Sequence, residues 1–202
     1  NKDSIALIYT LKNRPINNPL IAHVRGVEEA KTITKRWDHR CDKLANAFWP
    51  GPLTIILDRS GQVPSEASGG CKTIAIRAPK HEVAYKLLTT FGGPISAPSA
   101  NLSGRTSPTT AKHVHDDFGD ELFILDGGEC DRGIESTVLS MVGPPTILRL
   151  GSIKSCEIEN IIGEVVVHTP NTQNESPGSS MKHYAPKSKL VLETTEAIHN
   201  QC

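Results

Sequence analysis

A run of small hydroxyl and amide side chains at residues 96–110 has the composition of an anion-binding loop. It reads SAPSANLSGRTSPTT, and its side chains are on the whole too small to fill a core. Ser107 followed by Pro108 is typical of a helix start, with Ser107 as the N-cap and Pro108 at the first helical position. Because a helix N-terminus presents free N–H groups and partial positive charge, the run predicts a phosphate site.

Four cationic side chains lie at the ends of predicted elements. Lys12 and Arg14 follow a predicted helix, where they either complement its C-terminus or bind a phosphate or carboxylate. Arg77 and Arg149 end the apolar runs TIAIR and TILR. Ligands of α/β proteins bind where strands end, so each arginine is either a ligand-binding group or a surface ion-pair partner.

Other candidate residues are less specific. His23 lies in the apolar run 19–24, where a core histidine without a functional role is the more frequent outcome. The glycine turn at 126–128 and the GIESTV segment at 133–138 allow close backbone approach or simply connect elements. The sequence has no GxxxxGK[ST], GxGxxG or GxSxG motif. A hydrolase with Ser99 as nucleophile has little support, because no motif pairs a base with it.

The elements that would position these residues alternate along the chain. Helices are expected at residues 4–11, 27–48, 81–91 and 109–118. Strands are expected at residues 19–24, 53–57, 73–77, 94–97, 121–125, 136–142, 146–150 and 165–167. This pattern predicts one α/β domain with a twisted mixed parallel and antiparallel sheet flanked by helices. The closely spaced late strands favour the mixed sheet over a purely parallel one.

Composition restricts the function classes. Lys plus Arg and Asp plus Glu are each 22 of 202 residues, so the formal net charge is zero and the basic excess of a nucleic-acid binder is absent. No apolar run is long enough for a membrane span, and the start does not read as a signal peptide. Five scattered cysteines without a CxxC pair indicate reduced thiols and no zinc site. These features predict a cytoplasmic protein.

Domain boundaries follow from a change in composition near residue 168. Residues 169–189 are rich in Pro, Asn, Gln, Ser and Gly, which predicts a linker. We therefore expect a domain at 1–168 and the start of a second domain at 190–202.

Taken together, the motifs resemble the YrdC-like family of threonylcarbamoyl-AMP synthases. They occur in the family's order from Lys12 to Gly151: K-x-R-P, N-P-L-I-x-H-V, F-W-P-G-P-L-T, I-R-x-P, A-P-S-A-N-x-S-G with S-P-T, D-G-G, G-I-E-S-T-V and I-L-R-x-G. The segments SPG at 176–178 and HYAPK at 183–187 resemble the linker of the family's longer, two-domain branch.

The resemblance implies an ATP-dependent nucleotidyltransferase that converts L-threonine, bicarbonate and ATP into threonylcarbamoyl-adenylate and pyrophosphate. Downstream tRNA-modifying proteins would use the product, with at most weak tRNA contact by this chain. It places Lys12 and Arg14 at the phosphates as catalytic residues. It places further residues around ATP: Asn18, Thr73, Ser99, Asn101, Ser107, Arg149 and Tyr184. It places His23, Arg77, Ala97 and Ser136 around threonine. Mg²⁺ is expected with ATP, held mainly by phosphates and water, with no metal site of the protein's own.

One departure leaves two interpretations open. Family members carry a T-x-T-V-Y-G-L-G-like segment that lines the threonine and ATP site, and residue 1 lies after that point of the pattern. Either a longer protein supplies the segment, or the chain is a degenerate form of the family. The second interpretation predicts a non-catalytic RNA- or nucleotide-binding module of the same fold.

Overall fold

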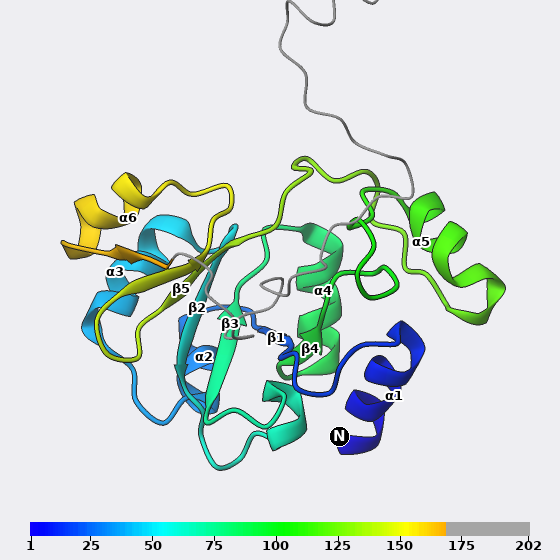
Figure 1. Ribbon diagram of the computed structural model, residues 1–202, viewed down its shortest axis with the longest axis horizontal. Helices are drawn as coiled ribbons and strands as arrows, with labels where there is room; N and C mark the ends of the chain where they lie inside the picture. The colour runs from blue at the N-terminus through cyan, green and yellow to red at the C-terminus, as the bar shows by residue number, and fades with distance from the viewer. Residues whose placement is uncertain (169–202) are drawn as a thin grey trace, which may run out of the picture.

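A seven-stranded sheet in the order β4-β1-β3-β2-β5-β6-β7 forms the centre of the computed structural model, which describes residues 1–168 (Figure 1). Its strands are β1 (Ile21–His23), β2 (Leu53–Asp58), β3 (Thr73–Arg77), β4 (Ile95–Ala97), β5 (Thr137–Ser140), β6 (Thr146–Arg149) and β7 (Val166–Val167). The pairs β1–β3, β2–β5 and β6–β7 are parallel, whereas β1–β4, β2–β3 and β5–β6 are antiparallel. The predicted α/β class with a mixed sheet is confirmed.

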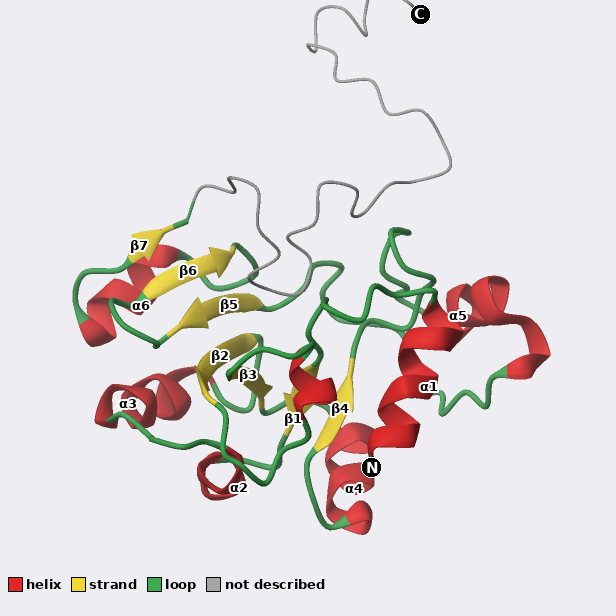
Figure 2. Cartoon of the chain, turned by 60° about the horizontal axis from the view of Figure 1, so that its bottom comes forward, coloured by secondary structure: helices red, strands yellow, loops and turns green. Residues whose placement is uncertain are grey.

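Helices flank this sheet. They are α1 (Lys2–Lys12), α2 (Val27–Ile33), α3 (His39–Phe48), α4 (Glu82–Phe91), α5 (Ala111–Phe118) and α6 (Ser155–Ile162), with the short 3-10 turns η1 (Ser65–Ser68) and η2 (Gly119–Glu121). Helices α1, α4 and α5 lie toward the β1 and β4 side, and α3 and α6 lie toward β5, β6 and β7 (Figures 1 and 2). Within residues 1–168, none of the helices has the length and apolar character needed to cross a bilayer.

The two faces of the sheet differ in what covers them. On one face, strand residues such as Ile55 and Ile76 pack into two core clusters with residues of α2, α3 and α6. On the other face, Ile56, Ala75 and Val138 form a small cluster to which no helix of residues 1–168 contributes. We call this second face the open face. Because side chains alternate along a strand, the residues two positions away from these three also point to it.

The expected helix over residues 27–48 is wrong, because the chain forms two helices there. Thr34 leaves helical geometry with φ −108° and ψ 148° and bridges to Arg59. The Asp38 side chain then accepts a hydrogen bond from the Arg40 N–H and caps α3. A non-local strand contact and a strong N-cap therefore override a continuous helical pattern.

Two further predictions near the candidate loop are wrong. The N-cap of α5 is Thr110, which accepts from the His113 N–H, so neither Ser107 nor Pro108 begins the helix. The Ser107 hydroxyl instead donates to the Glu135 carboxylate over 2.5 Å. Residues 121–125 form no strand: Phe123 is 90% exposed, and without a partner strand its segment has no ladder to join.

The described cysteines Cys41, Cys71, Cys130 and Cys156 form no disulfide with one another.

Candidate active site

Several strands meet at one edge of the sheet and bring polar side chains together there. The parallel strands β1 and β3 end side by side, so His23 lies opposite Arg77. Strand β2 runs antiparallel to β3 with Ile55 opposite Ile76, and Thr54 therefore lies across from Arg77. The Arg77 Nε donates to the Gly51 carbonyl over 3.0 Å. The predicted site residues His23 and Arg77 thus share one edge of the open face.

Ser136 and Arg149 complete this edge. The Arg149 Nη2 donates to the Ser136 carbonyl over 2.8 Å and lies 3.0 Å from the Ser136 hydroxyl. That hydroxyl is also 2.7 Å from the Thr54 hydroxyl. A side chain at Gly151 would collide with the backbone of residues 135–137, so glycine allows the turn after β6 to lie against the start of β5. We call His23, Thr54, Arg77, Ser136 and Arg149 the arginine cluster.

The electrostatics of the arginine cluster favour an anionic ligand. Burial and the nearby Arg149 both lower the pKa of Arg77. Burial and the charge of Arg77 lower the pKa of His23 to about 4, so this imidazole is neutral at pH 7. The buried Nδ1 of His23 has no hydrogen-bond partner in the described part of the chain. An orphaned buried nitrogen beside two arginines calls for a polar ligand group.

A second set of polar residues gathers where α1 ends. Lys12 is 5% exposed, and its Nζ donates to the carbonyls of Ser99, over 2.5 Å, and of Asn101. Arg14 is 8% exposed and donates to the Asn18 side chain over 2.7 Å and to the Pro19 carbonyl over 2.8 Å.

Asn101 closes the loop that follows β4. Its Nδ2 donates to the carbonyls of Leu102 and Arg105, each over 2.9 Å. Its Oδ1 is buried and lacks a partner within residues 1–168. We call Lys12, Arg14, Asn18, Ser99 and Asn101 the α1 cluster.

Three cations in these two clusters, the buried Lys12 and Arg14 and the partly buried Arg77, have no carboxylate partner among residues 1–168. No ion pair there involves any of them, and their hydrogen-bond acceptors are main-chain carbonyls or an amide. Burial and the charge of Arg14 lower the pKa of Lys12 to about 8, and burial lowers that of Arg14. Buried charges are normally paired, so this arrangement suits a ligand that brings negative charge.

Two further predicted site residues, Ala97 and Thr73, lie away from the end of β1 and β3 that carries the arginine cluster. Ala97 ends β4 opposite Ile21, at the other end of β1 from His23. Thr73 begins β3, four residues and about 13 Å from Arg77. Since Ile21 pairs with Ala75, the same register puts Thr73 beside Pro19 and hence near the α1 cluster. The structure therefore groups Thr73 with the predicted phosphate residues and not with Arg77.

Three residues with contacts to the site were not predicted from sequence. Thr54 binds Ser136, Glu135 accepts from Ser107, and Asp117 accepts from the loop residues Leu102 and Arg105. The alternation within LTIIL could have indicated Thr54, because its neighbours face the covered side. Asp117 gives no local signal, since its partners are distant in sequence. The predicted Tyr184 lies outside the described residues.

A surface pocket in the described part of the chain lies elsewhere. A pocket of about 460 Å³ is lined by Arg36, Trp37, Asp38, His39, Arg40, Leu57, Asp58, Met141, Val142 and Gly143. It lies where β2 and β5 end, opposite the edge that carries the arginine cluster, and it contains none of the predicted site residues. There the Arg40 guanidinium is paired with Asp38 over 2.7 Å. We therefore assign the candidate site from the buried cations and not from cavity size.

Two family models match the chain. One, described as telomere recombination and covering the Sua5, YciO and YrdC proteins, matches residues 1–151. The other, described as the C-terminal domain of threonylcarbamoyl-AMP synthase, matches residues 153–201.

Curated relatives carry one name. The threonylcarbamoyl-AMP synthase of Pyrococcus abyssi is 41% identical over 95% of this chain and 58% of its own length. That of Bacillus subtilis is 42% identical over 95% of this chain and likewise 58% of its own length. The chain thus spans somewhat more than half the length of these relatives.

Solved structures agree on the fold. The crystal structure of P. abyssi Sua5 complexed with L-threonine superposes with a TM-score of 0.92 at 38% identity, covering all of this chain and 62% of that one. Escherichia coli YciO superposes with a TM-score of 0.67 at 23% identity, covering 76% of this chain and 75% of that one. The YciO likeness supports the fold alone.

Proposed function

This chain belongs to the Sua5, YciO and YrdC family, and from that premise we propose that it carries the nucleotide- and threonine-binding domain of a threonylcarbamoyl-AMP synthase. The proposed reaction is a nucleotidyl transfer from ATP, with L-threonine and bicarbonate as the other substrates. The relatives of that name, and the Sua5 structure with L-threonine, support this assignment.

One observation carries the proposal: the buried Lys12 and Arg14 and the partly buried Arg77 are cations without a carboxylate partner among the described residues. A triphosphate and an amino-acid carboxylate would supply the missing negative charge at two neighbouring places. Arginine offers a two-pronged donor to either anion, and lysine a compact charge.

The two clusters suggest a division of roles. In the proposal the α1 cluster binds the phosphates of ATP, with Thr73 beside it. The arginine cluster, with His23, Arg77 and Ser136, binds threonine near Ala97. Arg149 contacts Ser136, so in the proposal it lies beside threonine as well as ATP. Ser107 donates to Glu135, the residue before Ser136, which brings it close to the arginine cluster. Tyr184 stays a predicted ATP residue.

The proposed reaction requires a site that orients the substrates and neutralises their charge. The threonine amine attacks the carbon of bicarbonate, and loss of water leaves a carbamate. A carbamate oxygen then attacks the α-phosphorus of ATP, and pyrophosphate leaves with the electron pair of the broken P–O bond. Because the carbamate decomposes in water, fixed donors and an enclosed site matter more than a covalent nucleophile. Lys12 and Arg14 would stabilise the charge that develops on the phosphates.

The described residues do not fit a metal site of the protein's own. Residues 1–168 contain no group of three or more His, Cys, Asp or Glu side chains able to hold a metal ion. We therefore expect Mg²⁺ to enter bound to the phosphates of ATP and to water.

Further parts of the proposal concern organisation and partners. We propose a catalytic domain at 1–168, a linker at 169–189 and a second domain starting at 190–202. Support for the first boundary comes from β7, which pairs with β6 in the same sheet. The downstream tRNA-modifying proteins, weak tRNA contact and a cytoplasmic location stay predictions.

The test is pyrophosphate release by the full-length protein. Release should require threonine and bicarbonate together, and Lys12→Ala or Arg14→Ala should lower it at least tenfold. Release that is indifferent to threonine would refute the synthase assignment. ATP binding without turnover would instead favour the non-catalytic module.

A further inference from the structure

The loop at residues 99–105 is fastened to the end of α1. Lys12 holds it from one side, because its Nζ donates to the carbonyls of Ser99 and Asn101. The Ser103 N–H donates back to the Lys12 carbonyl over 2.9 Å. The loop that carries two predicted ATP residues therefore takes its position partly from the lysine beside it.

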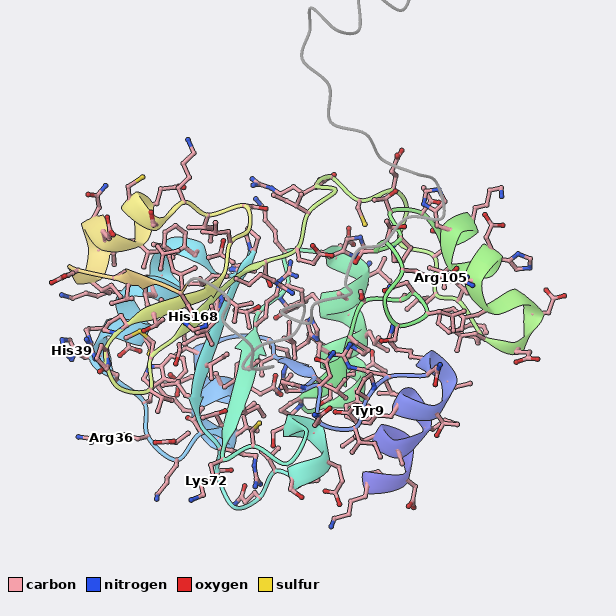
Figure 3. The ribbon with its side chains drawn as sticks, viewed as in Figure 1. Tyr9, Arg36, His39, Lys72, Arg105 and His168 are labelled. Atoms are coloured by element: carbon pink, nitrogen blue, oxygen red, sulfur yellow. The ribbon has the colours of Figure 1, made fainter. Side chains whose placement is uncertain are left out.

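The same loop is fastened on its far side to α5, through one carboxylate. The Asp117 Oδ2 accepts from the Leu102 N–H over 3.0 Å, and its Oδ1 accepts from Arg105 Nη1 over 2.5 Å. Asp117 is largely buried, with 16% of its side chain exposed, whereas Arg105 is 39% exposed. Arg105 lies beside α5 at the right of Figure 3.

We propose that Asp117 is a positioning residue of the nucleotide site: its carboxylate fixes the 99–105 loop from behind, so that the Ser99 and Asn101 carbonyls meet Lys12. This inference rests on the proposed function for its link to ATP. Asp117 contacts the loop through Leu102 and Arg105, so it acts on the nucleotide site through the loop and through its charge.

The charge of Asp117 acts on Lys12 as well. Burial and Arg14 depress the pKa of Lys12, and the Asp117 carboxylate opposes them. Asp117 therefore helps to keep Lys12 protonated near neutral pH, which is the form an anionic phosphate needs. A residue that only stabilised α5 would have no such effect on a lysine at the end of α1.

The chain offers a matched control one position away. Asp116 lies on the same helix and pairs with Lys112 over 2.9 Å in an exposed i,i+4 ion pair. Asp116→Asn removes the same charge from the same helix without touching the loop. Arg105→Ala removes the other partner of Asp117 but leaves the carboxylate in place.

The first measurement needs no nucleotide. The ¹³Cε signal of Lys12, in lysine-labelled protein and assigned by its absence in Lys12→Arg, is followed by NMR as a function of pH. Asp117→Asn should lower the pKa of Lys12 by about one unit. Asp116→Asn should leave this pKa unchanged, and Arg105→Ala should not lower it.

The second measurement is ATP affinity by calorimetry at pH 8. Asp117→Asn should weaken binding about fivefold or more, and Asp116→Asn should match the unsubstituted protein. If both aspartate variants give the same Lys12 pKa and the same affinity as the unsubstituted protein, the positioning role is refuted. If Asp117→Asn fails to fold, Arg105→Ala decides: it breaks one contact between Asp117 and the loop and should weaken ATP binding, and an affinity equal to that of the unsubstituted protein would refute the positioning role. Absence of ATP binding to the unsubstituted protein, with the expected NMR shifts, would refute the proposed function and leave the positioning of Lys12 standing.

Discussion

The α1 and arginine clusters form one cation-rich region of this molecule, and the start of α3 forms another. The two regions differ in whether their cations are paired with a carboxylate. At the α1 cluster and arginine cluster, Lys12 and Arg14 are buried and Arg77 is partly buried, and all three donate to main-chain carbonyls or an amide. At the start of α3, Arg40 is only partly buried and is paired with Asp38. Arg36 and His39 in that second region point outward, on the opposite side of the molecule from Arg105 (Figure 3).

The difference teaches how to recognise a binding site without a ligand. A surface ion pair contributes little to stability, and its two charges balance each other without a ligand. A buried cation without a carboxylate costs solvation free energy that folding alone does not recover. The α3 region therefore needs no ligand to balance its charge, although it borders a surface pocket. The α1 cluster and the arginine cluster need an anion for that balance.

The largest expected effect comes from removing two cations in each region. Lys12→Ala combined with Arg14→Ala should lower pyrophosphate release at least a hundredfold, or about 3 kcal/mol in transition-state stabilisation. Arg36→Ala combined with Arg40→Ala changes the net charge equally and should leave the rate within twofold. Equal losses in both pairs would mean that net charge, and not the site, sets the rate.

The acid side of the stability profile should reveal the buried His23. Its pKa is near 4 in the folded protein, against an ordinary value of 6.5 for a free side chain. The unfolded chain binds the extra proton between these values, so the free energy of unfolding should fall by up to about 3 kcal/mol as pH drops from 6.5 to 4. His23→Gln should reduce this dependence in urea unfolding. A His23→Gln profile identical to that of the unsubstituted protein would contradict the buried neutral imidazole.

Gly151 tests the close backbone approach behind the arginine cluster. Gly151→Ala would place a Cβ against the backbone of residues 135–137 and should cost about 2 kcal/mol of stability. Gly61→Ala is the control, because nothing lies within 4 Å of its added Cβ. Thermal unfolding should show a drop of about 4 to 8 °C for the first variant only. Equal melting of both variants would show that the turn after β6 can move away.

The smallest effect is the alkaline limb of ATP affinity. Lys12 loses its proton as pH rises through about 8. A phosphate ligand prefers the protonated form, so affinity should be highest below pH 8 and fall by up to about tenfold between pH 7 and 9. Calorimetry with Lys12→Arg should show a flatter profile, since arginine stays charged. The same fall in Lys12→Arg would assign the limb to another group.

Much of the fold was predictable, because strand periodicity is local. The apolar runs 53–57 and 73–77 became the central strands β2 and β3. The single helix over 27–48 was wrong, since the bridge from Thr34 to Arg59 joins positions whose pairing no local pattern reveals.

The site was predictable in its residue types and less so in its arrangement. Ser107 was assigned as a helix cap, yet its hydroxyl donates to Glu135, 28 residues away. The role of Asp117 was not predicted, because an aspartate in a polar helix looks solvent-exposed in sequence. The proximity of Thr73 to the α1 cluster follows only from the register of β1 against β3.

The central claim is that the cations of the α1 cluster and the arginine cluster bind an anion, and ATP-induced stabilisation tests it most directly. Thermal unfolding is recorded for the unsubstituted protein, Lys12→Met and Arg36→Met, with and without ATP. The ATP concentration is the same for all three and is about a hundred times the dissociation constant of the unsubstituted protein. ATP should raise the melting temperature of the unsubstituted protein and of Arg36→Met by about 5 to 10 °C. It should leave Lys12→Met nearly unchanged. An equal rise in Lys12→Met, or loss of the rise in Arg36→Met alone, would contradict the account.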